Sequence, residues 1–489
     1  MAASLKGVKC GKAPGPGNIP IELVKAAPSR VLEILATTFT RFMMGEEIPK
    51  EWKLAYISSI HKKGSRMDCK NYRGISVLSS LGRLYGRILK TRLEGEITDS
   101  EEQCGFRAGR SCIDNVFTLK TLIDKRTATG RATHVTFVDL HKAYDSVPLC
   151  KLWECMESCN INQLYVNAVK SLYLGTVSCI KVGSKISEEF SVSKGLRQGC
   201  CLAPTLFKIY LEHALKSWKA KCSGMGIPVG DHVLSTLLFA DDQVVISADV
   251  DDACYMLRKL QEEYAKWGLR INLSKTEHLT VGEPATDLML ENDKVNACNK
   301  YKYLGVTFSE AGSSVDDINN KIAQGKRAIR ALNTVLWNNK VKRETKTTIY
   351  KTILESICTY GSEVWELTGR NKARLKALEM DYWRRSCGVS RLEHITNEEI
   401  RRRMEVDGTI IDTIENKRLL WYGHMQRMTN ERWPKRVWDW VPPNRRKRGR
   451  PRRSWNVDVQ EAMTARGLRE EEWNNRGSWR LGSGIRLGL

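Results

Sequence analysis

The chain has 489 residues, enough for about three domains of ordinary size, and its 42% apolar content is typical of globular proteins. Its formal net charge is +23, from 79 Lys and Arg residues against 56 Asp and Glu residues. Such a surplus argues against an enzyme of neutral metabolites and favours a protein that binds nucleic acid, although surplus surface lysine gives the same total.

We interpret the first 50 residues as an N-terminal lead-in to the first domain, beginning with a Gly/Pro-rich loop. GKAPGPGNIP at 11–20 is followed by an apolar segment with a helical period through residues 31–35, which Pro28 interrupts. The first twenty residues lack the apolar core of a signal peptide, and no run of about 18 apolar residues occurs in the chain. We therefore expect an intracellular protein that does not span a membrane.

From Trp52 to about Ser309, short apolar runs alternate with longer helical periods, which predicts an α+β domain over residues 51–310. HVTFVDLHKAYDSV puts Asp139 at the end of a β-branched and aromatic run. STLLFADDQVVIS puts Asp241 and Asp242 between two apolar runs, at or beside a hairpin turn. An Asp-Asp pair at a turn is also common without any catalytic role.

The three acids predict a metal site. Like charges that lie together destabilise one another, and divalent cations offset that repulsion. Three carboxylates on neighbouring strand ends suit two-metal phosphoryl transfer with two Mg²⁺ ions, for which Mn²⁺ is a substitute. The fifteen cysteines, by contrast, have no zinc spacing, so we expect them to be reduced and buried, and we expect neither His394 nor His424 to bind metal.

Residues 311–390 predict a helical subdomain, because apolar positions repeat there at steps of three and four, behind Ser313, Ser314 and Asp316 as candidate caps. Residues 391–489 change character, and Trp and Arg dominate them. Seven of the fourteen tryptophans lie in this tail, at 421, 433, 438, 440, 455, 473 and 479. Among arginines they suit stacking on unpaired bases or template RNA, whereas a small Trp-anchored helical domain explains Trp421, Trp433 and Trp438 equally well.

The tail also carries RRKRGRPRR at 445–453, with seven cations in nine positions. Such a block predicts a nucleic-acid-binding arm or a nuclear-localisation signal, hence a protein of the nucleus and also of the cytoplasm. Arg448 and Arg450 belong to the tetrad RGRP, which resembles an AT-hook that lies in the minor groove of DNA.

Several segments together resemble a known family. FVDLHKAYDSV, GLRQGCCLAPTLF, LLFADDQVVIS, GLRINLSKTE and YKYLGV occur in the order of motifs A to E of the reverse transcriptases of non-LTR (LINE-like) retrotransposons. Upstream, WKLAYISSIHKKG, NYRGISVLSS and QCGFRAGRSCIDNV resemble that family's fingers motifs. The likeness is strong over residues 5–310 and looser in the tail.

The resemblance implies a right-hand polymerase: fingers, of which the lead-in is an N-terminal extension, and a palm with an antiparallel sheet, a helical thumb, then the basic Trp/Arg-rich C-terminal region. The implied activity is RNA-directed DNA polymerisation, in which dNTPs are added to the 3′-hydroxyl of primer or target DNA on an RNA template. Asp139, Asp241 and Asp242 then take the role of metal ligands. The oligomeric state stays open.

Other site residues are implied by the same motifs. Tyr144 is the steric gate that excludes a 2′-hydroxyl, unless it is an aromatic that packs in the palm. The remaining implied contacts are Lys63 (or Lys62) and Arg73 on the triphosphate, Gln198 and Gly199 near the templating base pair, Lys275 as proton donor or pyrophosphate contact, Tyr303-Leu304-Gly305 on the primer, and Phe106, Arg107 and Arg110 on the template. Isolated cations are usually solvated surface, and Gly199 also suits an ordinary loop. Asp145 is expected to cap or orient the local backbone.

Two departures from the family pattern stand out. GPGNIP occupies the place where the family usually has Asp before Gly-Ile-Pro, which puts N-terminal packing or template contacts in doubt. The upstream endonuclease domain usual in these elements is expected to be lacking, as in a truncated copy. Two rivals remain: a catalytically inactive, transposon-derived nucleic-acid-binding protein, and a maturase similar to those of group II introns.

Overall fold

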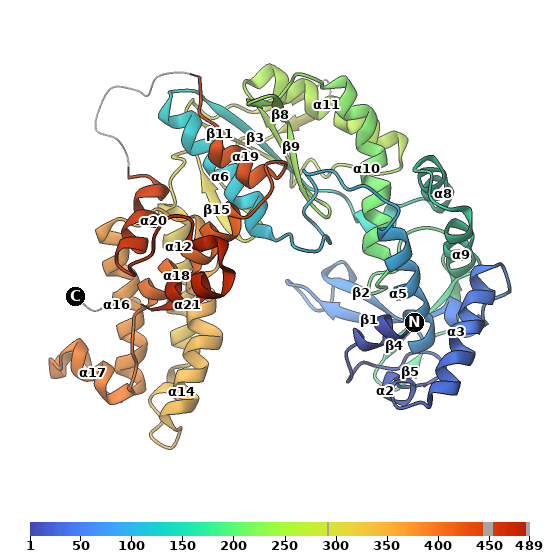
Figure 1. The fold of residues 1–489 in the computed structure, drawn as a ribbon, viewed down its shortest axis with the longest axis horizontal. Helices are drawn as coiled ribbons and strands as arrows, with labels where there is room; N and C mark the ends of the chain where they lie inside the picture. The colour runs from blue at the N-terminus through green and yellow to red at the C-terminus, as the bar shows by residue number, and fades with distance from the viewer. Residues whose placement is uncertain (291–292, 444–452, 486–489) are drawn as a thin grey trace.

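The computed structural model describes residues 1–290, 293–443 and 453–485. Fingers and a large helical body lie on opposite sides, and a central sheet lies between them at the top of the view in Figure 1. This is the right-hand polymerase architecture predicted from the motifs, with mixed helix and sheet. Among the described residues no helix has both the length and the apolarity needed to cross a membrane.

The fingers contain a sheet of order β2-β1-β4-β5, with β6 paired to β4. Strands β1 and β2 are antiparallel, whereas β1 and β4 are parallel. The strands are β1 (Leu54–His61), β2 (Tyr72–Val77), β4 (Val177–Val182), β5 (Lys185–Ile186) and β6 (Phe190–Ser191). The N-terminal and fingers helices are α1 (Ala2–Lys6), α2 (Ile21–Lys25), α3 (Ser29–Met43), α4 (Lys50–Lys53), α5 (Ser80–Glu94), α8 (Leu149–Ser158) and α9 (Gln163–Tyr173). The break between α2 and α3 falls at Pro28, as predicted, since proline has no N–H for a continuing helix.

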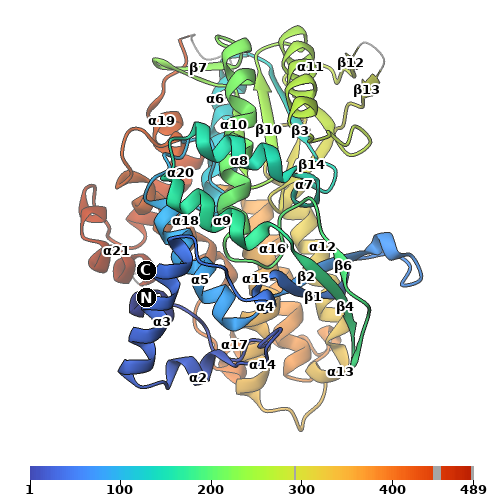
Figure 2. The same ribbon diagram turned by 90° about the vertical axis from the view of Figure 1, so that its right-hand side faces the viewer.

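The palm is an antiparallel sheet of order β11-β3-β10-β9. Its strands are β3 (Thr133–Val138), β9 (Thr236–Phe239), β10 (Asp242–Ser247) and β11 (Glu277–Val281). Alternate residues serve two cores: Val244 and Ile246 pack with α6 (Cys112–Ala128), whereas Val245 packs with α10 (Ala203–Lys221) and α11 (Val250–Lys266). Because both faces are covered, the strand ends are where polar side chains reach solvent. Figure 2 shows α8 and α9 beside α10.

Short hairpins complete the α+β part of the chain. They pair β7 (Ile227–Val229) with β8 (His232–Leu234), β12 (Leu288–Leu290) with β13 (Asp293–Val295), and β14 (Lys300–Tyr303) with β15 (Val306–Ser309). The helical turn α7 (Ala143–Ser146) follows β3. The predicted change from mixed structure to helices after about residue 310 is confirmed.

Most of the described residues after Ser309 are helical. They form α12 (Val315–Ala331), α13 (Asn333–Leu336), α14 (Arg343–Ile349), a π-helical turn (Tyr350–Glu355), α15 (Ser356–Thr359), α16 (Gly369–Ser386), α17 (Asn397–Met404), α18 (Ile410–Gln426), α19 (Trp433–Asp439), α20 (Trp455–Thr464) and α21 (Arg476–Gly484). Ser314 is the N-cap residue of α12, but its hydroxyl donates to Glu366 instead of capping the helix.

The tail belongs to the same core as the palm and the thumb. Phe117 of α6 lies against Trp455 at 5.0 Å and Trp421 at 5.5 Å between ring centroids, and Arg432 forms an ion pair with Asp114 of α6. Trp421, Trp433, Trp455 and Trp479 are buried, so stacking on bases is not open to these rings. The alternative prediction of a Trp-anchored helical structure is confirmed for Trp421 and Trp433, although these rings pack in the common core and not in a separate small domain.

The prediction for the cysteines needs a correction. All fifteen carry free thiols, but Cys10, Cys69, Cys150 and Cys159 are exposed. They lie in loops or on the solvent-facing sides of short helices, where nothing covers them. The apolar character of cysteine predicted burial, but placement depends on the element that carries it.

Candidate active site

Asp139 follows the last residue of β3 and is held by the segment that precedes β11. Its carbonyl oxygen accepts the backbone N–H of Asn272 at 2.7 Å, and its own N–H donates to the Thr276 hydroxyl at 3.3 Å. The side-chain amide of Asn272 donates to Asp139 Oδ2 at 3.0 Å. Asn272 is buried and is a site residue that the sequence patterns did not identify.

Asp241 and Asp242 occupy the turn between β9 and β10. Because β10 pairs with β3 in the register Gln243 to Val138, this turn lies beside Asp139. Loss of water around Asp242, together with the charges of Asp241 and Asp139, raises its pKa to about 6 even though its side chain keeps some exposure. Burial likewise raises the pKa of Asp241, to which Asp139 adds and which Arg73 opposes. The three predicted acids therefore interact electrostatically.

The donor set fits hard divalent cations such as Mg²⁺, which prefer carboxylate oxygens. In the described part of the chain no three His, Cys, Asp or Glu side chains close around a single point as a complete metal cage. Magnesium sites on nucleotide enzymes are usually built from one or two carboxylates plus substrate phosphates, so a complete cage is not required. The mutual repulsion of the three acids is the feature that bound cations relieve.

Two of the predicted cations face these acids. Lys275 Nζ lies 3.6 Å from Asp139 Oδ2, and the lysine side chain is 68% exposed. The positive charge of Arg73, on β2 of the fingers, opposes the rise in the pKa of Asp241. Lys63 is exposed in the β1–β2 connection, and the structure gives it no contact with the acids.

Tyr144 packs in the palm, which is the alternative weighed for it, and its role as a steric gate stays a prediction. Its ring stacks on Phe207 of α10, with centroids 4.4 Å apart and planes 16° apart, so it does pack in the palm. Its hydroxyl has no hydrogen-bond partner among the described residues, and burial and the charge of Asp241 raise its pKa. The hydroxyl is therefore close enough to Asp241 to feel its charge.

Gln198 and Gly199 connect the palm to the fingers. The Gln198 side chain donates to Asp145 Oδ1 at 3.2 Å, and its carbonyl oxygen accepts the N–H of Ser76 on β2 at 2.6 Å. Gly199 has φ +106°, and a Cβ there would lie 2.8 Å from the Ser76 carbonyl oxygen. Its lack of a side chain makes room for β2. The Asp145 carboxylate accepts from the Gln198 amide, and its role in orienting the local backbone stays a prediction.

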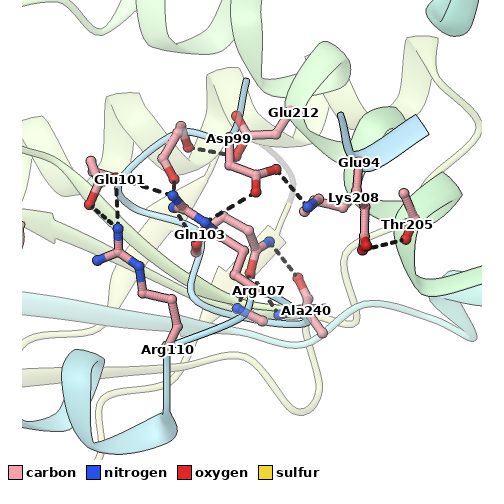
Figure 3. Close-up of polar contacts among 12 residues, drawn as sticks. Glu94, Asp99, Glu101, Gln103, Arg107, Arg110, Thr205, Lys208, Glu212 and Ala240 are labelled. Atoms are coloured by element: carbon pink, nitrogen blue, oxygen red, sulfur yellow. Dashed lines mark hydrogen bonds and ion pairs between the residues drawn. The ribbon is translucent and has the colours of Figure 1, made fainter. Parts of the chain in front are cut away.

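The three residues predicted to contact the template differ in exposure. Phe106 is 47% exposed. Arg107 and Arg110 turn inward: Arg107 pairs with Asp99 at 3.1 Å and Glu101 at 3.2 Å, and Arg110 pairs with Glu101 at 2.7 Å (Figure 3). Their side chains are 14% and 10% exposed. These guanidinium groups stabilise their own loop, and template contact stays a prediction for all three residues.

The last motif forms the predicted hairpin. Leu304 and Gly305 have φ +45° and +84° at the β14–β15 turn, while the Tyr303 hydroxyl accepts a hydrogen bond from Asn115 at 3.3 Å. Tyr303 is 3% exposed, which agrees with the alternative of strand packing for this side chain. Arg448 and Arg450 lie outside the described residues, so the AT-hook and nuclear signal stay predictions.

Relatives of this chain include polymerases of mobile elements. Over 471 residues the chain is 27% identical to the probable RNA-directed DNA polymerase from transposon X-element of Drosophila melanogaster, covering 90% of this chain and 49% of the relative. It is 26% identical to the RNA-directed DNA polymerase from mobile element jockey of the same fly, over 77% of this chain and 42% of the relative. The chain thus spans about half or less of the length of these relatives. The predicted resemblance to non-LTR retrotransposon polymerases is confirmed.

Among solved structures, apo telomerase from Candida tropicalis matches 85% of this chain and 75% of its own, at 12% identity and a TM-score of 0.41. The family model described as reverse transcriptase (RNA-dependent DNA polymerase) matches residues 60–308, from the end of β1 to β15, and so includes every acid of the site. The chain belongs to the reverse transcriptase family.

Proposed function

We propose that the chain is an RNA-directed DNA polymerase that adds dNTPs to a DNA 3′-hydroxyl on an RNA template. The observation that carries the proposal is the clustering of Asp139, Asp241 and Asp242 at the ends of the palm strands, where burial and the charges of the neighbouring acids raise the pKa values of Asp241 and Asp242. The membership of the chain in the reverse transcriptase family supports it. The net charge of +23 supports binding of template RNA and of primer or target DNA.

The three aspartates would hold two Mg²⁺ ions. Such ions activate the attacking 3′-oxygen and stabilise charge on the triphosphate when they are bound. In the reaction the 3′-oxygen forms a bond to the α-phosphorus, the bond to the bridging oxygen breaks, and pyrophosphate leaves. Asn272 supports this chemistry from within the chain, because its two hydrogen bonds to Asp139 restrict the orientation of that carboxylate.

The neighbouring residues supply positive charge and selectivity. Arg73 comes from the fingers and faces Asp241, so it suits the triphosphate of the incoming nucleotide. Lys275, exposed beside Asp139, suits transfer of a proton to the leaving pyrophosphate. Tyr144, braced by Phe207, suits exclusion of a 2′-hydroxyl because a stacked ring cannot move aside easily.

The test is primer extension by the purified chain with a DNA primer, an RNA template, dNTPs and Mg²⁺. We expect extension of the primer that EDTA abolishes and that added Mg²⁺ restores. Tight template binding without extension by the intact chain would instead favour the inactive nucleic-acid-binding protein. Splicing of a bound intron RNA without extension would favour the maturase.

A further inference from the structure

We infer that Gln103 is a positioning residue for the acids. Its side-chain amide hydrogen-bonds to the backbone of the Asp241-Asp242 turn, where a neighbouring strand would otherwise pair, and so fixes the conformation of the turn. The inference rests on the proposed polymerase function, because it assigns a task to the same site. Its structural part concerns β9, Ala240 and the loop before α6, and can be measured without any catalysis.

Strand β9 is an edge strand, since the palm order β11-β3-β10-β9 ends with it. An edge strand leaves every second N–H and C=O without a partner in the sheet, and such groups need hydrogen bonds when they are buried. Leu238 carries such outward-facing backbone groups on β9, and so does Ala240, which follows the strand. The loop at 102–105 runs parallel to them: Leu238 N–H donates to Glu102 at 2.9 Å, and Cys104 N–H donates to the Leu238 carbonyl at 2.9 Å.

At Ala240 the backbone pairing stops and the Gln103 side chain takes over. Its Oε1 accepts the Ala240 N–H at 3.0 Å, and its Nε2 donates to the Ala240 carbonyl oxygen at 3.3 Å. One side-chain amide therefore makes both bonds that a peptide group of another strand would make. Gln103 is 1% exposed, so water cannot replace these bonds easily.

The turn needs such a lock because of its conformation. Ala240 has φ +60°, a left-handed backbone that residues with a Cβ seldom adopt without support. Gly105 permits the close approach, since a Cβ there would lie 2.1 Å from the Ala240 nitrogen, and the Gly105 N–H donates to Gln103 Oε1 at 2.7 Å. Asp241 is the next residue, so any relaxation at Ala240 moves a proposed metal ligand.

The loop is in turn held by charges, which explains the inward arginines. Arg107 donates to the carbonyl oxygens of Ser100 at 2.6 Å and Gln103 at 3.1 Å, and Asp99 bridges Arg107 to Lys208 of α10 at 2.6 Å (Figure 3). Lys208 is buried, so this contact fixes the loop against the palm helix. The loop that carries Gln103 is therefore fixed to α10, and Gln103 in turn fixes the Asp241-Asp242 turn.

The test compares Gln103→Leu and Gln103→Glu with the intact chain. Leu keeps the approximate volume and removes both bonds, whereas Glu can still accept the Ala240 N–H but, when ionised, cannot donate to its carbonyl. Val459→Ala, on α20, is the control for general loss of stability, because Val459 is buried in the shared core but belongs neither to the loop at 102–105 nor to the Asp241-Asp242 turn. Hydrogen exchange of the peptide containing residues 236–242 and Mn²⁺ binding followed by paramagnetic resonance are measured beside dNTP incorporation.

For Gln103→Leu we expect the Ala240 amide to exchange at least about 10-fold faster, because its hydrogen bond is gone. We expect weaker Mn²⁺ binding and a kcat lower by roughly 10- to 100-fold, with the KM for dNTP changed by less than about 3-fold, since a misplaced ligand harms the reacting geometry more than substrate binding. Gln103→Glu should exchange more slowly than Gln103→Leu. The control should change none of these readouts below its melting temperature.

If the Ala240 amide of Gln103→Leu exchanges at the wild-type rate, Gln103 does not fix the turn and the inference is wrong. If the amide exchanges faster but Mn²⁺ binding and kcat are unchanged, Gln103 does not position the acids. If Gln103→Leu does not fold, Gln103→Glu decides by the same criteria. An intact chain without polymerase activity contradicts the proposed function, whereas exchange and Mn²⁺ binding still decide whether Gln103 locks the turn.

Discussion

Asn272 holds Asp139 by two hydrogen bonds at once, from its side-chain amide to Oδ2 at 3.0 Å and from its backbone N–H to the carbonyl oxygen at 2.7 Å. The two residues are 133 positions apart in the chain. These bonds restrict how the Asp139 carboxylate can turn, and Asn272 takes up only one of its two oxygens.

Asn272→Leu is therefore expected to lower kcat for dNTP incorporation by roughly 10- to 100-fold, because Asp139 gains freedom to turn away from the site. Steady-state kinetics on an RNA template with a DNA primer measure this. Asn167→Ala, at an exposed position on α9, is the matched control and should behave as the intact chain. Equal kcat values for Asn272→Leu and the control would contradict the role of Asn272.

Tyr144 is predicted to select dNTPs over rNTPs. Tyr144→Val removes the ring stacked on Phe207 and opens space beside Asp241, so discrimination should fall by roughly 10- to 100-fold, the range expected when a pocket gains room for one small group. Tyr144→Phe keeps the ring and should keep the discrimination. The ratio of kcat/KM for dNTP and rNTP measures both variants, and an unchanged ratio in Tyr144→Val would assign Tyr144 to packing alone.

The palm strands themselves were accessible to prediction from the sequence, because alternating and β-branched runs mark β3, β9 and β10 and the acids stand where those runs end. Asn272 and Gln103 were not. A single Asn or Gln carries no periodic signal, and both act on segments more than 130 residues away. The internal ion pairs of Arg107 could not be predicted from its charge either. An arginine that pairs with a carboxylate of its own chain and an arginine that binds phosphate look alike in a sequence.

A buried histidine pair makes the palm sensitive to acid. His278 on β11 is fully buried, with its Nε2 3.3 Å from Nδ1 of His134 on β3, and burial together with His134 lowers its pKa to about 4. The folded state then resists protonation that the unfolded state accepts near pH 6.5. Stability should thus be full above about pH 6.5 and fall as the pH drops towards 4, by on the order of 2 kcal/mol at pH 5.

Urea unfolding of the intact chain and of His278→Gln between pH 7 and pH 4 checks this. The variant cannot gain the proton, so its free energy of unfolding should fall less over the same interval. Parallel pH profiles for both proteins would show that His278 is not the sensitive group.

The tail is predicted to be part of the stable core. Trp455 is 8% exposed, lies against Phe117 of α6 and donates its indole N–H to the Glu363 carbonyl oxygen at 2.7 Å. Trp455→Ala should lower the free energy of unfolding by about 3–5 kcal/mol, as removal of a buried aromatic side chain does. Trp337, which is 41% exposed, offers a matched control, and Trp337→Ala should cost much less. Equal losses would mean that the tail is not anchored through Trp455.

The claim that Asp139, Asp241 and Asp242 form the metal site of a polymerase is tested most directly by dNTP incorporation on a poly(rA) template with an oligo(dT) primer and Mg²⁺. The comparison is between the intact chain, Asp139→Asn, the double variant Asp241→Asn/Asp242→Asn, and Asp145→Asn as control. Asn at 145 can still accept the hydrogen bond from Gln198, so this variant should keep most of the activity.

The first two variants should lose activity by about 1000-fold or more, because bound metal contributes several kcal/mol of transition-state stabilisation. They should still bind the template, since the basic surface is unchanged. Incorporation by Asp139→Asn or by the double variant within about 10-fold of the intact chain, a loss of less than about 1.4 kcal/mol, would contradict the account.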